Sequence, residues 1–229
     1  MKTLFVIPEI RLDSKPTNIP FWAGILASII ENKNGQVAIL DLNALRMKFG
    51  GKQVPTKVII DEISSENWDL VGIGGLTTTY GRIKELTPLI KKYAPNAIVV
   101  GGGGWSTYNP HEILQLIPEL DLIVIGEGEI TFSELYDQIE SGNKDFEKVN
   151  GLCLRDKEQI YKFTNPRALI SDLDTVPYPA YHLLETDIYF EHSAYSYSVE
   201  SFNSKRRAST CWERGCPRGC TFCSHNGMS

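Results

Sequence analysis

The first 143 residues alternate five times between a short apolar run and an amphipathic segment, and this alternation limits the fold more than any other feature of the chain. The runs at 97–100 and 122–125 are apolar on successive residues, as strands covered on both faces must be. The segments between the runs have the spacing of helices. The pattern therefore predicts an α/β fold with a doubly wound, five-stranded parallel sheet and helices on both of its faces.

The boundaries of these elements follow from where each apolar pattern starts and stops. We expect strands at residues 3–7, 36–42, 69–74, 97–102 and 121–125, and helices at residues 21–31, 57–67, 81–93, 110–117 and 130–141. Five units with short turns fit the flavodoxin-like (Rossmann-like) strand order 2-1-3-4-5 better than a six-stranded dinucleotide fold. In such sheets a ligand sits beyond the carboxyl ends of the strands.

The loops expected at that edge are rich in glycine and hydroxyl side chains. Glycine lets a ligand approach the backbone closely, and hydroxyls and helix amino ends offer it hydrogen bonds. No G-x-G-x-x-G with a suitably placed acidic residue and no phosphate loop is present, which weighs against NAD, FAD and nucleoside triphosphates. Glu127 and Glu129 precede a predicted helix, and carboxylates are favourable at the amino end of a helix even where no ligand binds. The candidate binding residues are Thr77, Thr78, Thr79, Tyr80, Gly102, Gly103, Trp105, Ser106, Gly126, Glu127, Gly128 and Glu129.

Composition narrows the class of protein. The chain has 229 residues, 42% of them hydrophobic, enough for one full core and part of a second. No run approaches the roughly 20 apolar residues of a membrane span, and charge follows the first residues too early for a signal peptide, so we expect a cytoplasmic protein without membrane contact. The net charge of −5 argues against nucleic acid as a partner.

The five cysteines are concentrated near the C-terminus: none precedes Cys153, and four lie between residues 211 and 223. A disulfide framework would be spread through the fold, so thiols for a cofactor fit better. Cys216, Cys220 and Cys223 have the spacing C-x3-C-x2-C, in a loop with two glycines and a proline that suits an iron-sulfur cluster. The alternative is a zinc site that recruits Cys211, but zinc ligands usually come in two separated pairs.

The cysteine spacing, with Phe222 before the last cysteine, resembles the radical S-adenosylmethionine (SAM) superfamily. The resemblance implies that Cys216, Cys220 and Cys223 ligate a 4Fe-4S cluster and that SAM binds at its open iron, close to Phe222. Segments 19–27, 71–74, 98–102 and 125–135 resemble the cobalamin-binding domain of cobalamin-dependent radical SAM enzymes, and residues 173–180 resemble its linker. Cobalamin is the cofactor that this second resemblance implies for the candidate loops.

Two positions have no histidine where related cobalamin-binding sequences have one. Gly104 stands where family members often have a histidine, and Asn43 stands at the histidine position of the D-x-H-x-x-G motif that ligates cobalt elsewhere. The resemblance then implies cobalamin with its nucleotide tail detached and no protein imidazole on cobalt.

After residue 143 the pattern changes. We expect a connector at 144–204, with a hairpin formed by residues 151–155 and 159–163, and the start of a radical SAM domain at 205–229, with a first strand at 206–211. Such a barrel needs on the order of 200 residues, so we interpret this domain as truncated. Cys153 and Cys211 are expected to pack as small hydrophobic side chains.

The resemblance implies the N-terminal portion of a cobalamin-dependent radical SAM enzyme. Its reduced cluster would cleave SAM to a 5'-deoxyadenosyl radical, with an electron from a donor such as flavodoxin or ferredoxin. The reaction would be methyl transfer to an unactivated carbon, or ring formation on a tetrapyrrole. The chain alone is expected not to turn over SAM. The alternatives are a non-catalytic cobalamin-binding module and a tRNA-modifying enzyme, the latter disfavoured because residues 1–152 contain no cysteine.

Overall fold

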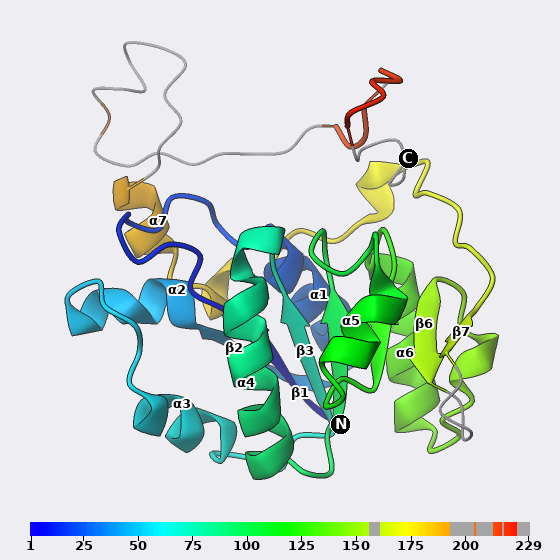
Figure 1. Ribbon diagram of the computed structural model, residues 1–229, viewed down its shortest axis with the longest axis horizontal. Helices are drawn as coiled ribbons and strands as arrows, with labels where there is room; N and C mark the ends of the chain where they lie inside the picture. The colour runs from blue at the N-terminus through cyan, green and yellow to red at the C-terminus, as the bar shows by residue number, and fades with distance from the viewer. Residues whose placement is uncertain (156–160, 193–203, 205–212, 217, 224–229) are drawn as a thin grey trace.

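The computed structural model describes residues 1–155, 161–192, 204, 213–216 and 218–223. Within these residues the strands form one seven-stranded sheet in the order β2-β1-β3-β4-β5-β6-β7 (Figure 1). The first five strands run parallel, so the predicted order 2-1-3-4-5 is confirmed. Their bounds are β1 Lys2–Ile7, β2 Gln36–Asp41, β3 Leu70–Gly74, β4 Ile98–Gly102 and β5 Leu122–Val124.

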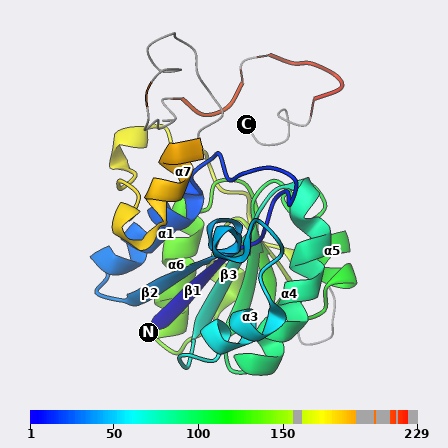
Figure 2. The same ribbon diagram turned by 90° about the vertical axis from the view of Figure 1, so that its left-hand side faces the viewer.

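Helices cover both faces of the sheet, as predicted (Figure 2). On one face, α1 (Phe21–Asn32) and α6 (Glu129–Glu140) bury side chains such as Ala27 and Leu135 against the strands. On the other face lie α3 (Thr56–Ile63), α4 (Tyr80–Tyr93) and α5 (Pro110–Leu116). The central strands are buried on both sides, which explains their continuously apolar sequences.

The predicted hairpin is present and joins the sheet. β6 (Leu152–Arg155) pairs antiparallel with β5, and β7 (Tyr161–Phe163) pairs antiparallel with β6. The hairpin covers the edge of β5, which would otherwise expose unpaired backbone groups. Cys153 is fully buried opposite Ile123, so its predicted packing role is confirmed. The proposed domain boundary at residue 143 stays a prediction.

Two short helices were not predicted from the sequence: α2 (Leu42–Leu45) directly after β2, and α7 (Thr186–His192). The segment that leads to α7 crosses back over α1, where the backbone N–H of Ala180 donates to the carbonyl of Gly24 at 2.9 Å. A Cβ at Gly24 would lie 2.8 Å from Pro179, so the glycine permits this approach. The crossing brings α7 beside the carboxyl end of the sheet (Figure 2).

None of the helices within the described residues is long and apolar enough to span a membrane. The strand predicted at 206–211, including Cys211, lies outside the described residues.

Candidate cofactor site

A cavity of about 370 Å³ opens where β1, β3, β4 and β5 end. Its inner part is aromatic: Phe5 meets Trp22 edge-on with ring centroids 6.0 Å apart, and Phe132 at 5.2 Å. These side chains come from β1, α1 and α6, so the cavity extends between the sheet and the helices of one face. A pocket of this size with a mostly apolar lining suits an uncharged, largely apolar group.

The cavity exists because glycines occupy the neighbouring strand positions. A Cβ on Gly72 would lie 2.7 Å from the Phe5 ring, and a Cβ on Gly74 would lie 3.0 Å from the Trp22 ring. A larger residue at Gly72 would push the Phe5 ring out of place, and one at Gly74 would require the Trp22 ring to give by a few tenths of an ångström. The two glycines of β3 therefore fix where Phe5 and Trp22 stand.

Two loop glycines have backbone angles that other residues rarely adopt. Gly103 has φ +94°, and a Cβ there would lie 3.0 Å from the carbonyl oxygen of Gly75. Gly126 has φ +71°, with no atom within 4 Å of a Cβ built on it. The loop after β4 thus packs directly on the loop after β3, while the loop after β5 leaves space at the cavity.

Two polar side chains at the edge of the cavity, those of Asn43 and Tyr189, are hydrogen-bonded to other residues of the chain. The side-chain oxygen of Asn43 accepts hydrogen bonds from the backbone N–H of Ile10 at 3.4 Å and from Nε of Arg46 at 3.3 Å. Tyr189 of α7 also lines the cavity, and its hydroxyl donates to Asp41 at 2.7 Å. These bonds join α7 and the loops after β1 and β2 around one opening.

Residues 10–136 match the B12 binding domain family, and this span contains most of the cavity lining. The chain belongs to the B12 binding domain family. Its relatives include the anaerobic magnesium-protoporphyrin IX monomethyl ester cyclase of Synechocystis, 35% identical over 159 residues that make up 69% of this chain and 29% of the cyclase. A cytidylyl-2-hydroxyethylphosphonate methyltransferase of Streptomyces wedmorensis is 27% identical over 97% of this chain and 47% of that protein.

Solved structures of cobalamin-dependent radical SAM enzymes share the fold. The radical SAM methyltransferase TsrM from Kitasatospora setae, with cobalamin and a [4Fe-4S] cluster bound, superposes with a TM-score of 0.61 and 22% identity over 77% of this chain and 31% of that one. OxsB with aqua-cobalamin gives a TM-score of 0.66 and 18% identity over 78% of this chain and 24% of that one. The chain thus spans less than half the length of the relatives named here.

The cobalamin-contact residues predicted from the sequence fall into two groups in the structure. One group lines the cavity and consists of Thr79, Gly102, Gly103, Gly126, Gly128 and Glu129. The other group stands beside it. Thr77 and Thr78 are exposed, Tyr80 packs on Trp105 with centroids 6.4 Å apart, and Glu127 turns toward a second cavity.

Trp105 and Ser106 donate hydrogen bonds to the backbone of the glycine-rich loop after β4. The Trp105 side chain is buried in the core on the α4 and α5 face, and its Nε1 donates to the carbonyl of Gly102 at 2.7 Å. The hydroxyl of Ser106, also buried, donates to the carbonyl of Gly103 at 3.3 Å. Both side chains hold the backbone of the loop in place and leave its outer surface open.

Phe5, Trp22, Phe132 and Tyr189 line the cavity but were missed as site residues by sequence reasoning. Gly72 carried the available signal, because a glycine inside an otherwise apolar strand marks a close approach by another group. Phe5 is opposite Gly72 in the register of β1 and β3. Tyr189 had no such signal, since its contact depends on where the chain crosses α1.

The predicted cluster cysteines lie in a separate loop above the sheet edge. Gly215 adopts φ +83°, and the backbone N–H of Cys223 donates to the carbonyl of Cys220 at 3.1 Å. Cys216 is exposed, and Phe222, the predicted SAM contact, is 91% exposed. Within the part of the chain that the structure describes, no three His, Cys, Asp or Glu side chains lie close enough together to hold a metal ion. The cluster assignment therefore stays a prediction from the spacing.

Proposed function

We propose that this chain binds cobalamin at the carboxyl edge of its sheet, as the cofactor-binding portion of a radical SAM enzyme. The observation that carries the proposal is the glycine-built aromatic cavity, which lies where β1, β3, β4 and β5 end. A corrin ring is too large for this volume, but the flat apolar base of the nucleotide tail suits it. The glycines at the opening, Gly103, Gly104 and Gly126, leave the backbone accessible to the larger part of the cofactor.

The donor set fits a cobalamin that takes no imidazole from the protein. Among the described residues that line the cavity, none is a histidine, cysteine or methionine. Asn43 stands at the histidine position of the D-x-H-x-x-G motif, and its side-chain oxygen already accepts two hydrogen bonds. The residues of the opening would bind and orient the cofactor while leaving cobalt without a nitrogen ligand.

Cys216, Cys220 and Cys223 are the residues that would hold a 4Fe-4S cluster, since thiolates are its usual ligands. Phe222 would contact SAM. The exposure of Cys216 and Phe222 leaves room for SAM and for an electron donor such as a flavodoxin or ferredoxin. When bound, these cofactors supply a substrate radical and a transferable methyl group.

The reaction that we propose for the whole enzyme is methylation of an unactivated carbon. Relatives across nearly the full length of this chain are named as methyltransferases, including one from Pyrococcus horikoshii that is 29% identical over 98% of this chain and 45% of that protein. Cyclase chemistry on a tetrapyrrole is the second candidate, favoured by the 35% identity to the Synechocystis cyclase.

Equilibrium dialysis with hydroxocobalamin tests the site. Gly104 lines the cavity, and a Cβ on it meets no atom within 4 Å, so the side chain of Gly104→Leu starts in open space at the cavity. We expect this variant to weaken binding by about tenfold or more, because the added side chain overlaps the ligand. Gly81→Leu is the matched control, since Gly81 is equally unobstructed but outside the cavity.

Absence of binding by the unmodified chain, or equal binding by the two variants, would contradict the proposed site. A bound-state spectrum with a nitrogen ligand from the protein would contradict the predicted ligation. Cobalamin binding by a full-length enzyme that never cleaves SAM would favour a non-catalytic cobalamin-binding module.

A further inference from the structure

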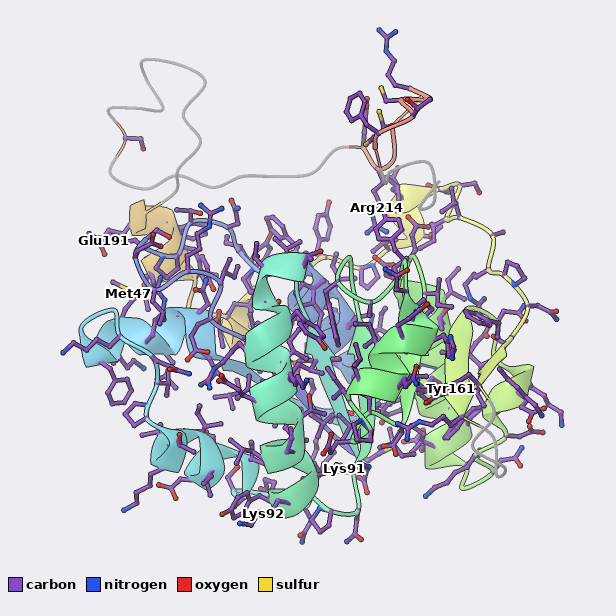
Figure 3. The ribbon with its side chains drawn as sticks, viewed as in Figure 1. Met47, Lys91, Lys92, Tyr161, Glu191 and Arg214 are labelled. Atoms are coloured by element: carbon purple, nitrogen blue, oxygen red, sulfur yellow. The ribbon has the colours of Figure 1, made fainter. Side chains whose placement is uncertain are left out.

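An arginine next to the cysteine loop contacts the loop after β5. Arg214 lies two residues before Cys216, and its guanidinium spans two carboxylates: Nη1 is 3.1 Å from Oε1 of Glu127, and Nη2 is 2.6 Å from Oε1 of Glu129. Figure 3 labels Arg214 between the segment that carries the cysteines and the upper loops of the sheet. Two segments more than 80 positions apart in sequence therefore meet through one side chain.

The two carboxylates are largely sheltered from solvent, while Arg214 lies at the surface with its side chain partly covered. The exposed fractions of the side chains are 31% for Arg214, 18% for Glu127 and 13% for Glu129. Ion pairs that use both arms of a guanidinium and are partly desolvated are stronger than surface pairs. Glu127 and Glu129 are neighbours of like charge, so removal of the cation would leave them to repel each other.

The loop that receives Arg214 is itself fixed on other sides. The second carboxylate oxygen of Glu127 accepts the backbone N–H of Ile170 at 2.7 Å, and the backbone N–H of Gly126 donates to Oγ1 of Thr107 at 3.3 Å. Glu129 lines the cobalamin cavity, and Glu127 lines the neighbouring cavity of about 670 Å³. A group held at this loop is therefore held at the border of the cofactor site.

The geometry points to Arg214 as a positioning residue that holds the cysteine loop against Glu127 and Glu129, so that the cluster ligands stand beside the cobalamin cavity. This inference deepens the proposed function and rests on it for the identity of the two cofactors. Arg214 acts through the two glutamates and touches no reacting atom. Its fork geometry matters, because lysine offers a single point charge that cannot bridge two carboxylates in the same way.

Hydrogen exchange in the cofactor-free chain tests the contact directly. In Arg214→Gln we expect amides of residues 126–130 and 213–216 to exchange about tenfold faster, since the closed arrangement loses its cation. Arg214→Lys should give an intermediate rate. Arg218→Gln is the matched control, because it removes the same charge from an exposed position in the same loop. Exchange of the buried β3 amides should be equal in all variants, which separates a local opening from a loss of the fold.

Swapping the charges at positions 214 and 129 gives a second test of the contact. Arg214→Glu combined with Glu129→Arg should restore slow hydrogen exchange relative to Arg214→Glu alone.

Spin coupling between the two cofactors gives a further test. After loading with hydroxocobalamin, iron and sulfide and reduction, the spin coupling between Co(II) and the reduced cluster should be altered in Arg214→Gln and unchanged in Arg218→Gln.

Exchange in Arg214→Gln that matches Arg218→Gln would overturn the inference, as would identical spin coupling in the two variants. Faster exchange together with no cobalamin binding by any chain, the unmodified one included, would leave the Arg214 contact established and refute the proposed function instead.

Discussion

The hydroxyl of Tyr189 donates a hydrogen bond to Oδ2 of Asp41 at 2.7 Å, across 148 positions of sequence. Asp41 ends β2 and caps α2, where its other oxygen accepts the backbone N–H of Ala44 at 3.0 Å. The bond joins α7 to the carboxyl edge of the sheet beside the cavity that Tyr189 lines. Burial raises the pKa of Asp41 from 3.8 to about 6, against the opposing effect of these hydrogen bonds.

The raised pKa predicts a pH-dependent stability. Between pH 3.8 and about 6 the unfolded chain ionises Asp41 while the folded protein keeps it protonated, so this contribution is full below pH 3.8 and is lost as the pH rises through about 6. The loss is on the order of 3 kcal/mol at most, at about 1.36 kcal/mol for each pKa unit. Asp41→Asn retains a capping oxygen and does not titrate.

Denaturant unfolding of both proteins at pH 4, 5, 6 and 7 measures this effect. The free energy of unfolding of Asp41→Asn should rise relative to the unmodified protein from pH 4 to pH 6 and then level off, because other titrating groups cancel in the difference. A difference that stays constant with pH would rule out the burial of an ionisable Asp41.

Removal of the Tyr189 hydroxyl should destabilise the attachment of α7. In Tyr189→Phe the buried Asp41 oxygen loses its donor, and we expect a loss of about 1–3 kcal/mol in the free energy of unfolding. Tyr181→Phe is the control, since Tyr181 is 41% exposed on the same connecting segment. Equal stability of the two variants would show that the Asp41 contact contributes nothing.

Gly103 and Gly104 are adjacent but are predicted to respond differently to alanine. Gly103→Ala forces a Cβ onto φ +94° and to within 3.0 Å of the Gly75 carbonyl, which should cost about 1–3 kcal/mol of stability. Gly104→Ala meets no atom within 4 Å and should be close to neutral. Thermal unfolding of the two variants decides the point, and equal melting temperatures would contradict the strained loop geometry.

Three cysteines are predicted to ligate the cluster, and Cys153 is predicted not to. Anaerobic reconstitution with iron and sulfide should yield a brown species that is lost in Cys216→Ala, Cys220→Ala and Cys223→Ala but retained in Cys153→Ala. Burial, with a smaller contribution from Glu112, raises the pKa of the Cys153 thiol to about 11, so that it is a poor ligand. Cluster loss in Cys153→Ala, or stoichiometric zinc in place of iron, would refute the assignment.

Much of the fold was predictable because its signals are local. Apolar periodicity placed the first five strands and the helices between them to within a few residues, and it also placed the hairpin. The glycine loops after β3, β4 and β5 were recognisable because glycine is required wherever the backbone turns sharply or approaches a ligand. Helix α2 was not predicted, since its four residues are too few to show a period.

The sequence by itself determined the parallel α/β sheet, the glycine-rich edge and the cysteine spacing. The periods of strands and helices and the spacing of ligands depend only on residues that are close together in the sequence. Only the tertiary structure decided that Phe5, Trp22 and Phe132 enclose a cavity, that the hairpin extends the sheet and that Tyr189 reaches Asp41. These contacts depend on which apolar faces are buried together and on where the chain crosses itself. No local pattern specifies that choice, because its free energy comes from packing between distant segments.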